Sequence, residues 1–353
     1  MSGESARTFT LIPRKVQRLG ASSLIVTIPK EWARRNGIKV GDVISLVDVG
    51  DRLIILPKNY LKRTIVRFDG KHKRVVMHIG RVSLCGFIFG QDRIIVDTPR
   101  QGTAREVLSR LERVMKILPY IYVRGRGKQV IIDLESPMED PWTAFKGLGN
   151  HTVNFLEKLI SLLDSNPNSG ISVEELETLR VEALRNSFRL LRTVSLSDAR
   201  GGLESVLGLH LFLYASLLGV AVEEFHDIGR SIVELKDRMS EDERERVKAF
   251  LQMLEVALAT LSTNMDSYSV KKVEEAHWRL KSLLDVKTSV DPVIDGASPA
   301  YAYILGKLTS LASVLELAGS VMACYMVMQK YSERVEESEV GLAPQGVDSV
   351  EPR

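Results

Sequence analysis

The sequence predicts a multidomain α+β protein that is mainly helical, and three observations lead to this prediction. The chain has 353 residues, and a single hydrophobic core seldom serves more than about 250–300 residues. Short β-branched runs with turn residues fill the N-terminal part. From about residue 142 onward, apolar residues recur with helical spacing. We expect a β domain at 7–58, a small α/β segment at 59–140, a helical domain at 141–335 and a disordered tail at 336–353.

The N-terminal domain is predicted from strand runs and turn residues. Residues 24–28 form a β-branched run, and residues 30–36 suit one or two helical turns. Gly37 fits the left-handed position that ends a helix. Two further strands with a tight hairpin at 50–51 complete a unit that is too small to bury a good core alone. We therefore expect this domain to dimerise.

The α/β segment is predicted as a small sheet with one helix across it. Thr103 and Glu106 have the spacing of a capping box, which would open an amphipathic helix that runs to about Leu118. We find no motif in this segment that carries chemistry. The expected strands are 63–68, 74–79, 93–97, 121–123 and 129–134.

The helical domain is predicted as two tandem three-helix bundles, at about 143–239 and 240–333. The order of helix lengths, medium, medium and long, occurs twice. Three helix starts have capping signals. These signals are Ser172 with Glu175, Ser240 with Glu243, and Ser298 followed by Pro299. The expected helices are 143–164, 172–195, 202–239, 240–263, 267–288 and 298–333.

The charges are distributed unevenly between the two parts of the chain. Residues 1–140 carry a net charge of +12 and the remainder a net charge of −9. This asymmetry indicates that only the front part faces a polyanion, because phosphate contacts supply most of the affinity for nucleic acid. Ordinary solvated surface charge is the alternative on composition alone. The candidate DNA-binding residues are Arg14, Lys15, Arg18, Lys30, Arg34 and Arg35.

Several protein classes are not expected. Cys85 and Cys324 are far apart in the sequence, which excludes a disulfide scaffold, and we expect both to be buried as small apolar residues. The sequence shows no nucleophile elbow, phosphate loop, zinc-protease or dinucleotide motif, so we expect no enzyme. We expect the apolar stretch 206–222 to be a buried bundle helix rather than a membrane insertion, and we expect the protein to be cytoplasmic.

The N-terminal residues resemble a known DNA-binding family. Residues 20–32 (GASSLIVTIPKEW) and 37–44 (GIKVGDVI) are similar to the AbrB/MazE/SpoVT swapped-hairpin domain. The resemblance implies a homodimer in which hairpins of two chains interleave, and which binds DNA through basic side chains on one face. It assigns this role to Arg14, Lys15, Arg18, Arg34 and Arg35.

The helical half resembles a second family. Residues 222–229 (VEEFHDIG), late in the third long helix, are similar to the metal motif of PhoU-type phosphate-signalling proteins. The resemblance implies a divalent or iron metal ion at Glu223 and Asp227, which lie four residues apart on one helix face. The second repeat departs from the motif, since it keeps Glu316 but has Ser320 where an acid is expected. The whole arrangement resembles an archaeal type of PhoU-related regulator.

Two functions from different classes follow. The first is a DNA-binding transcriptional regulator linked to phosphate uptake, with DNA and a second copy of the chain as partners. The second is a phosphate-signalling adaptor that inhibits a transporter or kinase by direct contact, with phosphate transporter components as partners. The two functions differ in whether the basic face of the N-terminal domain is needed for activity, because only the first function requires it.

Overall fold

The computed structural model shows two compact units, residues 1–62 and residues 63–353. The described residues are 12–20, 23–48, 53–56, 64–118, 120–135, 139–164, 172–199, 205–264, 271–272, 275, 277–279, 281 and 296–331. The predicted hairpin at 50–51 and the predicted tail at 336–353 lie outside this set.

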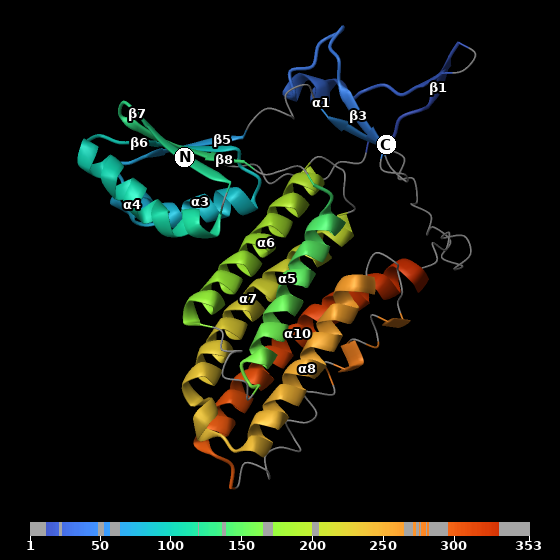
Figure 1. The fold of residues 1–353 in the computed structure, drawn as a ribbon. Coiled ribbons are helices and arrows are strands. Elements are labelled where there is room, and N and C mark those ends of the chain that lie inside the picture. Colours follow the sequence, from blue (N-terminus) through green and yellow to red (C-terminus); the bar gives the residue numbers. More distant parts are fainter. Residues whose placement is uncertain are drawn as a thin grey trace, which may run out of the picture. The chain divides into compact units, whose positions relative to one another are not determined.

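The N-terminal unit contains two separate β-hairpins and one short helix (Figure 1). Strands β1 (Gln17–Leu19) and β2 (Ser23–Ile25) pair antiparallel, as do β3 (Ser45–Asp48) and β4 (Leu53–Leu56). Helix α1 (Lys30–Arg35) lies between the two hairpins in the sequence. It ends as predicted, because Gly37 has a φ of 65°, a left-handed conformation that glycine adopts without strain.

The α/β segment is a four-stranded sheet in the order β5-β6-β8-β7, with its helices on one face (Figure 1). Strands β5 and β6 are parallel, and the other two neighbouring pairs are antiparallel. The elements are β5 (Ile65–Asp69), α2 (Lys73–Met77), α3 (Ile79–Ile88), β6 (Arg93–Asp97), α4 (Gln101–Ile117), β7 (Ile121–Arg126) and β8 (Gln129–Leu134).

Three predictions for this segment were wrong. The segment contains three helices, α2, α3 and α4, where one was expected. The stretch 74–79 is helical rather than a strand, because Val76 and Ile79, three residues apart, both turn into the core beneath the sheet. Helix α4 begins at Gln101 and no side chain caps it, so Thr103 lies inside its first turn. Its predicted apolar face is confirmed in part, since Val107 and Leu111 are fully buried whereas Leu108 and Met115 are exposed.

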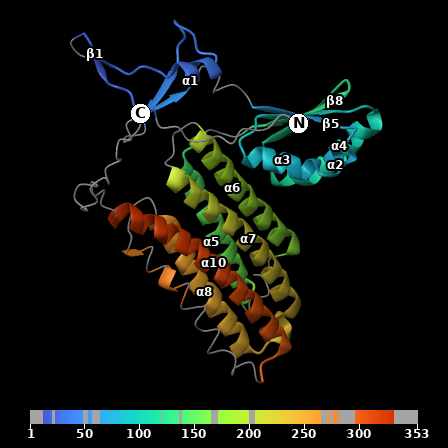
Figure 2. The same cartoon turned by 180° about the vertical axis from the view of Figure 1, so that it is seen from behind.

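Five of the six predicted helices are assigned in the helical half, and most of the predicted helix at 267–288 lies outside the described residues. Its fully assigned helices are α5 (Pro141–Ser161), α6 (Val173–Ala199), α7 (Ser205–Leu235), α8 (Glu241–Asn264) and α10 (Pro299–Tyr331). A short 3-10 turn, η2 (Lys236–Arg238), follows α7. The two views show these helices running alongside one another (Figure 2). The first helices of the two predicted repeats, α5 and α8, pack together, and so do the third helices, α7 and α10.

Helix starts in this half are fixed by the predicted capping residues. The Ser172 backbone N–H donates to the Glu175 carboxylate at 2.7 Å, and the Ser240 N–H donates to Glu243 at 2.8 Å. Glu243 has a second role, because it also accepts from the backbone N–H of Ser298 at 2.7 Å. One carboxylate therefore joins the beginnings of α8 and α10.

The α/β segment and the helices have separate hydrophobic cores that meet at α6. Arg192 of α6 is 1% exposed and its guanidinium lies 4.7 Å from the Phe87 ring centroid. It donates to the backbone carbonyls of Phe87, Gln91 and Leu134 at 2.8, 3.0 and 2.7 Å. A buried cation thus links two structures that the sequence predicted as separate domains.

Two observations concern the apolar helices and the cysteines. By length and composition, α7 and α10 are each apolar enough to cross a membrane, and 44% and 50% of their most apolar windows are buried. Both helices pack against one another.

The prediction for the cysteines was wrong, because Cys85 and Cys324 are both exposed on helix faces that turn away from the core.

Candidate nucleic-acid interface

The first group of candidate DNA-binding residues lies on the β1–β2 hairpin. Arg14 and Lys15 precede β1, and Arg18 lies within it, opposite Leu24 of β2. All three basic side chains are exposed. Arg14 donates to the carbonyl of its neighbour Pro13 at 3.1 Å, which leaves its charge in solvent. These three cations are therefore accessible to a polyanion.

The second group lies on α1. Lys30 is the first residue of this helix, and Arg34 and Arg35 form its last turn, where the helix dipole favours cations. Arg34 pairs with Glu31 at 2.8 Å, but both side chains are more than two-thirds exposed. Such surface pairs contribute little and exchange readily for another anion. All three cations of this group are exposed.

The single chain does not assemble the two groups into one closed body. Within the described part of the unit, the sheet β1-β2 has no backbone pairing with the sheet β3-β4. No described residue of the N-terminal unit is buried. Its apolar side chains lie in solvent instead, with Leu24 72% and Val43 80% exposed. Apolar surface of this extent in so small a unit indicates that a further surface completes it.

The predicted metal motif lies on α7 among basic side chains. Arg180 donates to the Glu223 carboxylate at 2.8 Å, and Lys307 lies 3.8 Å from Asp227. His226 lies 3.4 Å from Glu177. Within the part of the chain that the structure describes, no group of three or more His, Cys, Asp and Glu side chains could hold a metal ion. The surroundings of Glu223 and Asp227 favour ion pairs over a metal ion, and the metal stays a prediction.

The electrostatics of this helix face agree with ion pairing. The hydrogen bond from Arg180 holds the pKa of Glu177 below its usual value, and the Arg180 pKa is raised by the same contact. In the second repeat, Glu316 accepts a hydrogen bond from Ser320 at 3.0 Å. The Ser320 hydroxyl also lies 3.2 Å from His277. The polar pair Glu223 and Asp227 on α7 and the pair Glu316 and Ser320 on α10 are both four residues apart, but their surroundings differ.

One basic region was missed by sequence reasoning. Lys71, Lys73 and Arg100 come together at one end of the α/β sheet, where they line a hollow. They lie in the two turns that follow the parallel strands β5 and β6. The sequence contains an indication of this region, because strands β5 and β6 are each followed within four residues by at least one basic residue. Recognising it required knowing that the two strands are parallel neighbours.

Comparison with known proteins assigns the N-terminal region. Residues 17–63 match the family model described as antidote-toxin recognition MazE, bacterial antitoxin. The N-terminal unit therefore contains a MazE-like domain, and this domain includes Arg18, Lys30, Arg34 and Arg35. Comparison with curated proteins and with solved structures finds no match to the chain.

Proposed function

We propose that the protein is a dimeric DNA-binding transcriptional regulator. One observation carries the proposal, namely that the MazE-like domain at 17–63 has its basic side chains exposed on a hairpin and on a short helix. Exposed cations on a rigid frame are what phosphate contacts require. The alternative of ordinary surface charge is less favoured, because residues 1–140 carry a net charge of +12 while the rest of the chain is acidic.

The dimer is supported by the exposed apolar side chains of the same domain. Val16, Leu24 and Val43 are each more than half exposed in the single chain, as is Leu46 on β3. A second copy with the same hairpins would bury these side chains and bring a second set of cations to the assembly. We assign dimerisation to interleaved hairpins of two chains.

The proposal also links the regulator to phosphate uptake, through the helical half. Two observations support this link. Residues 222–229 are similar to the motif of PhoU-type proteins, and the helices pack with first on first and third on third, as expected for tandem three-helix repeats. In the proposal the helical half senses phosphate status or docks a partner. The protein acts in the cytoplasm and has no catalytic role.

The experiment measures binding of the purified full-length protein to genomic DNA fragments, for the wild type and for an Arg34→Ala/Arg35→Ala variant. The matched control is Arg244→Ala/Arg246→Ala, which removes the same charge from α8. We expect binding by the wild type and the control, with at least about tenfold weaker binding by the Arg34/Arg35 variant. Sedimentation of the same samples should give the mass of a dimer.

Three results would redirect the proposal. Equal binding by all three proteins would place the DNA contact outside α1. No binding by any of them would favour the adaptor, in which the N-terminal domain serves to dimerise and the helical half acts on a phosphate transporter or kinase by contact. Copurification of a toxin-like partner with the N-terminal domain would instead favour the antitoxin function that the family model describes.

A further inference from the structure

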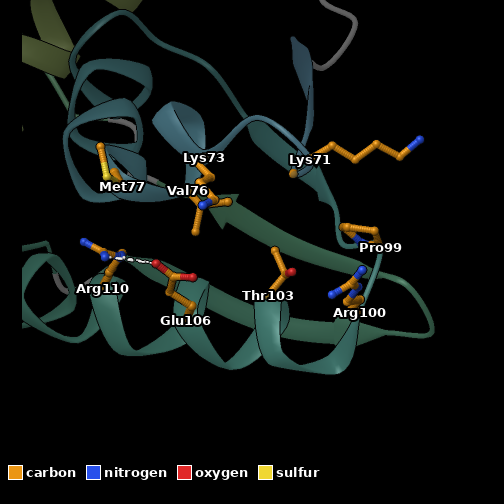
Figure 3. A pocket seen from close by; sticks show the side chains of 10 residues that line it. Lys71, Lys73, Val76, Met77, Pro99, Arg100, Thr103, Glu106 and Arg110 are labelled. Atoms are coloured by element: carbon orange, nitrogen blue, oxygen red, sulfur yellow. Dashed lines mark hydrogen bonds and ion pairs between the residues drawn. The ribbon is translucent and has the colours of Figure 1, made fainter.

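A hollow of about 710 Å³ opens at one end of the α/β sheet (Figure 3). It lies where the neighbouring parallel strands β5 and β6 end, at Asp69 and Asp97. Ligands of α/β proteins bind preferentially outside the carboxyl ends of parallel strands, because the turns that follow can converge on them. The size also falls within the range of small-molecule sites. Neither turn has a role in the function proposed above.

The lining of this hollow is strongly basic. Lys71 and Lys73 come from the turn after β5, and Arg100 comes from the turn after β6. Among the described residues, no carboxylate forms an ion pair with any of these three cations. Arg110 and Glu106 also line the hollow, but they neutralise one another at 2.9 Å. Within the described part of the chain, the lining therefore offers three cations without a carboxylate partner.

The acidic residue at the end of β6 does not cancel this charge. Asp97 accepts two hydrogen bonds from Arg67, at 2.7 and 2.9 Å, and a third from Gln129. The Arg67 guanidinium beside Asp97 holds the pKa of this carboxyl below its usual value. Asp97 is therefore an ionised carboxylate bonded to Arg67 and Gln129, and it does not pair with Lys71, Lys73 or Arg100.

A polar and an apolar surface meet in the hollow. Figure 3 shows Thr103 of α4 facing Val76 of α2 across the opening, while the Lys71 side chain extends outward from the rim. Val76 is buried, and Met77 and Pro99 add further apolar surface. Such a lining suits a ligand with an anionic end and a less polar body.

The strand ends are held close together by a glycine. The Gly70 backbone N–H donates to the Asp97 carbonyl at 2.8 Å, and a Cβ at Gly70 would lie only 2.3 Å from that oxygen. Only glycine permits this approach. The two turns that carry the cations are thus fixed next to one another. A second, smaller hollow of about 500 Å³ adjoins the first at Lys71 and Pro99 and adds Arg126 and Lys128.

We propose that this basic hollow binds a phosphorylated small molecule of nucleotide size. The phosphate groups lie against Lys73 and Arg100, with Lys71 at the rim, and accept from the Thr103 hydroxyl. The less polar part of the ligand lies against Val76 and Met77. Several uncompensated cations favour a multiply charged phosphate over a single carboxylate. The site gives the α/β segment a ligand-binding role that does not depend on whether the N-terminal domain binds DNA.

The test titrates the full-length protein, without DNA, with inorganic phosphate, inorganic pyrophosphate, AMP and ATP in a calorimeter. The variant is Lys73→Ala/Arg100→Ala. The control is Arg105→Ala/Arg113→Ala, which removes the same charge from exposed positions of α4 outside the hollow. We expect at least one phosphate compound to bind the wild type and the control. Its Kd should rise by about a hundredfold in the variant, since each lost charged contact accounts for about tenfold.

The outcomes separate the possible sources. Tight binding of pyrophosphate alone would support a site for the phosphate group, and tighter binding of a nucleotide would support a site that also contacts the body of the ligand. Equal Kd values in variant and control would overturn the proposal, as would binding of none of the four compounds. If the variant binds all four compounds like the wild type, and a separate titration with DNA shows weaker binding than for the control, the same cations belong to a nucleic-acid interface instead. Thermal unfolding checks that both variants are folded.

Discussion

The buried arginine at the junction of the α/β segment and the helices gives the sharpest stability prediction. Arg192 is 1% exposed and donates three hydrogen bonds to the carbonyls of Phe87, Gln91 and Leu134. The substitution Arg192→Ala removes all three bonds together with the contact to the Phe87 ring. It leaves carbonyl groups in a region from which water is excluded.

The magnitude follows from these contacts. Each buried acceptor left without a partner costs about 1–3 kcal/mol, and the missing side-chain volume adds a cavity term. Removal of the buried charge offsets part of this loss, because its own desolvation disappears. We expect Arg192→Ala to lower the free energy of unfolding by about 3–5 kcal/mol. The substitution Arg192→Met keeps much of the volume and should be milder.

The assay combines denaturant unfolding with hydrogen exchange. The control is Arg185→Ala, because Arg185 also lies on α6 and also donates to an α/β backbone carbonyl, that of Lys116, but at a more exposed position. We expect a loss below about 1 kcal/mol for the control. Exchange should accelerate in α3 and β8 for Arg192→Ala only. Equal losses for the two variants, or unchanged exchange in both elements, would refute the assignment of Arg192 as the link.

Three further predictions concern the helical half. Glu243→Ala should lower the free energy of unfolding by about 1–2 kcal/mol, and Glu175→Ala should lower it by about 1 kcal/mol or less. The difference arises because Glu243 caps two helices and Glu175 caps one. Urea unfolding measures both losses. The loss caused by Glu243→Ala should shrink as the pH falls from about 5 to about 3. Gly149→Ala should destabilise the fold by about 1–3 kcal/mol, because the new Cβ would lie 2.5 Å from the Ser262 Cβ. Gly147→Ala should stabilise the fold by about 0.5–1 kcal/mol, because the atom nearest to its new Cβ would lie 3.6 Å away. Thermal unfolding shows the sign of each effect.

The sign of the pH prediction follows from hydrogen bonding to a carboxylate. Burial at the junction would by itself raise the pKa of Glu243, but the N–H groups of Ser298 and Ser240 that donate to its charged form lower it overall. A carboxyl whose folded pKa is lowered contributes stability above its unfolded pKa, and this contribution disappears as the pH falls through the folded pKa. A loss that grew toward acidic pH would contradict the assignment.

The other two predictions have equally direct contradictions. Equal losses for the two capping variants would mean that the contact between Glu243 and Ser298 contributes nothing measurable. If both alanine substitutions stabilised the protein, α5 and α8 would be able to move apart freely at Ser262. If both destabilised it, the open space at Gly147 would not be enough for a methyl group.

Local signals in the sequence located most of the helical half. Ser172, Ser240 and Ser298 mark helix beginnings, and each makes the capping hydrogen bond that its sequence context predicts. Such bonds involve residues three apart, so that neighbouring residues suffice to predict them. Gly37 is a similar case, because the end of α1 depends on its own backbone conformation.

The predictions failed where contacts between residues far apart in the sequence determine the structure. The β-branched stretch at 74–79 became helical, because the core under the sheet takes Val76 and Ile79 from the same side. Arg192 looks like a surface residue in the sequence, and only the packing of α6 on the α/β segment shows that it is buried. The basic hollow depends on the parallel pairing of β5 and β6, which no local pattern reveals.

The most direct test of the central claim is the salt dependence of DNA binding. If about half of the six exposed cations of each chain contact phosphates in a dimer, about six contacts form, and the slope of log K against log salt is about −5. Affinity should then fall by about a thousandfold between 50 and 200 mM salt. The Arg34→Ala/Arg35→Ala variant removes four of the twelve cations of the dimer and, with half of them in contact, should have a slope shallower by about 2, while Arg244→Ala/Arg246→Ala keeps the wild-type slope. A wild-type slope near zero would contradict a DNA interface on the N-terminal domain, and one slope shared by all three proteins would exclude α1 from that interface.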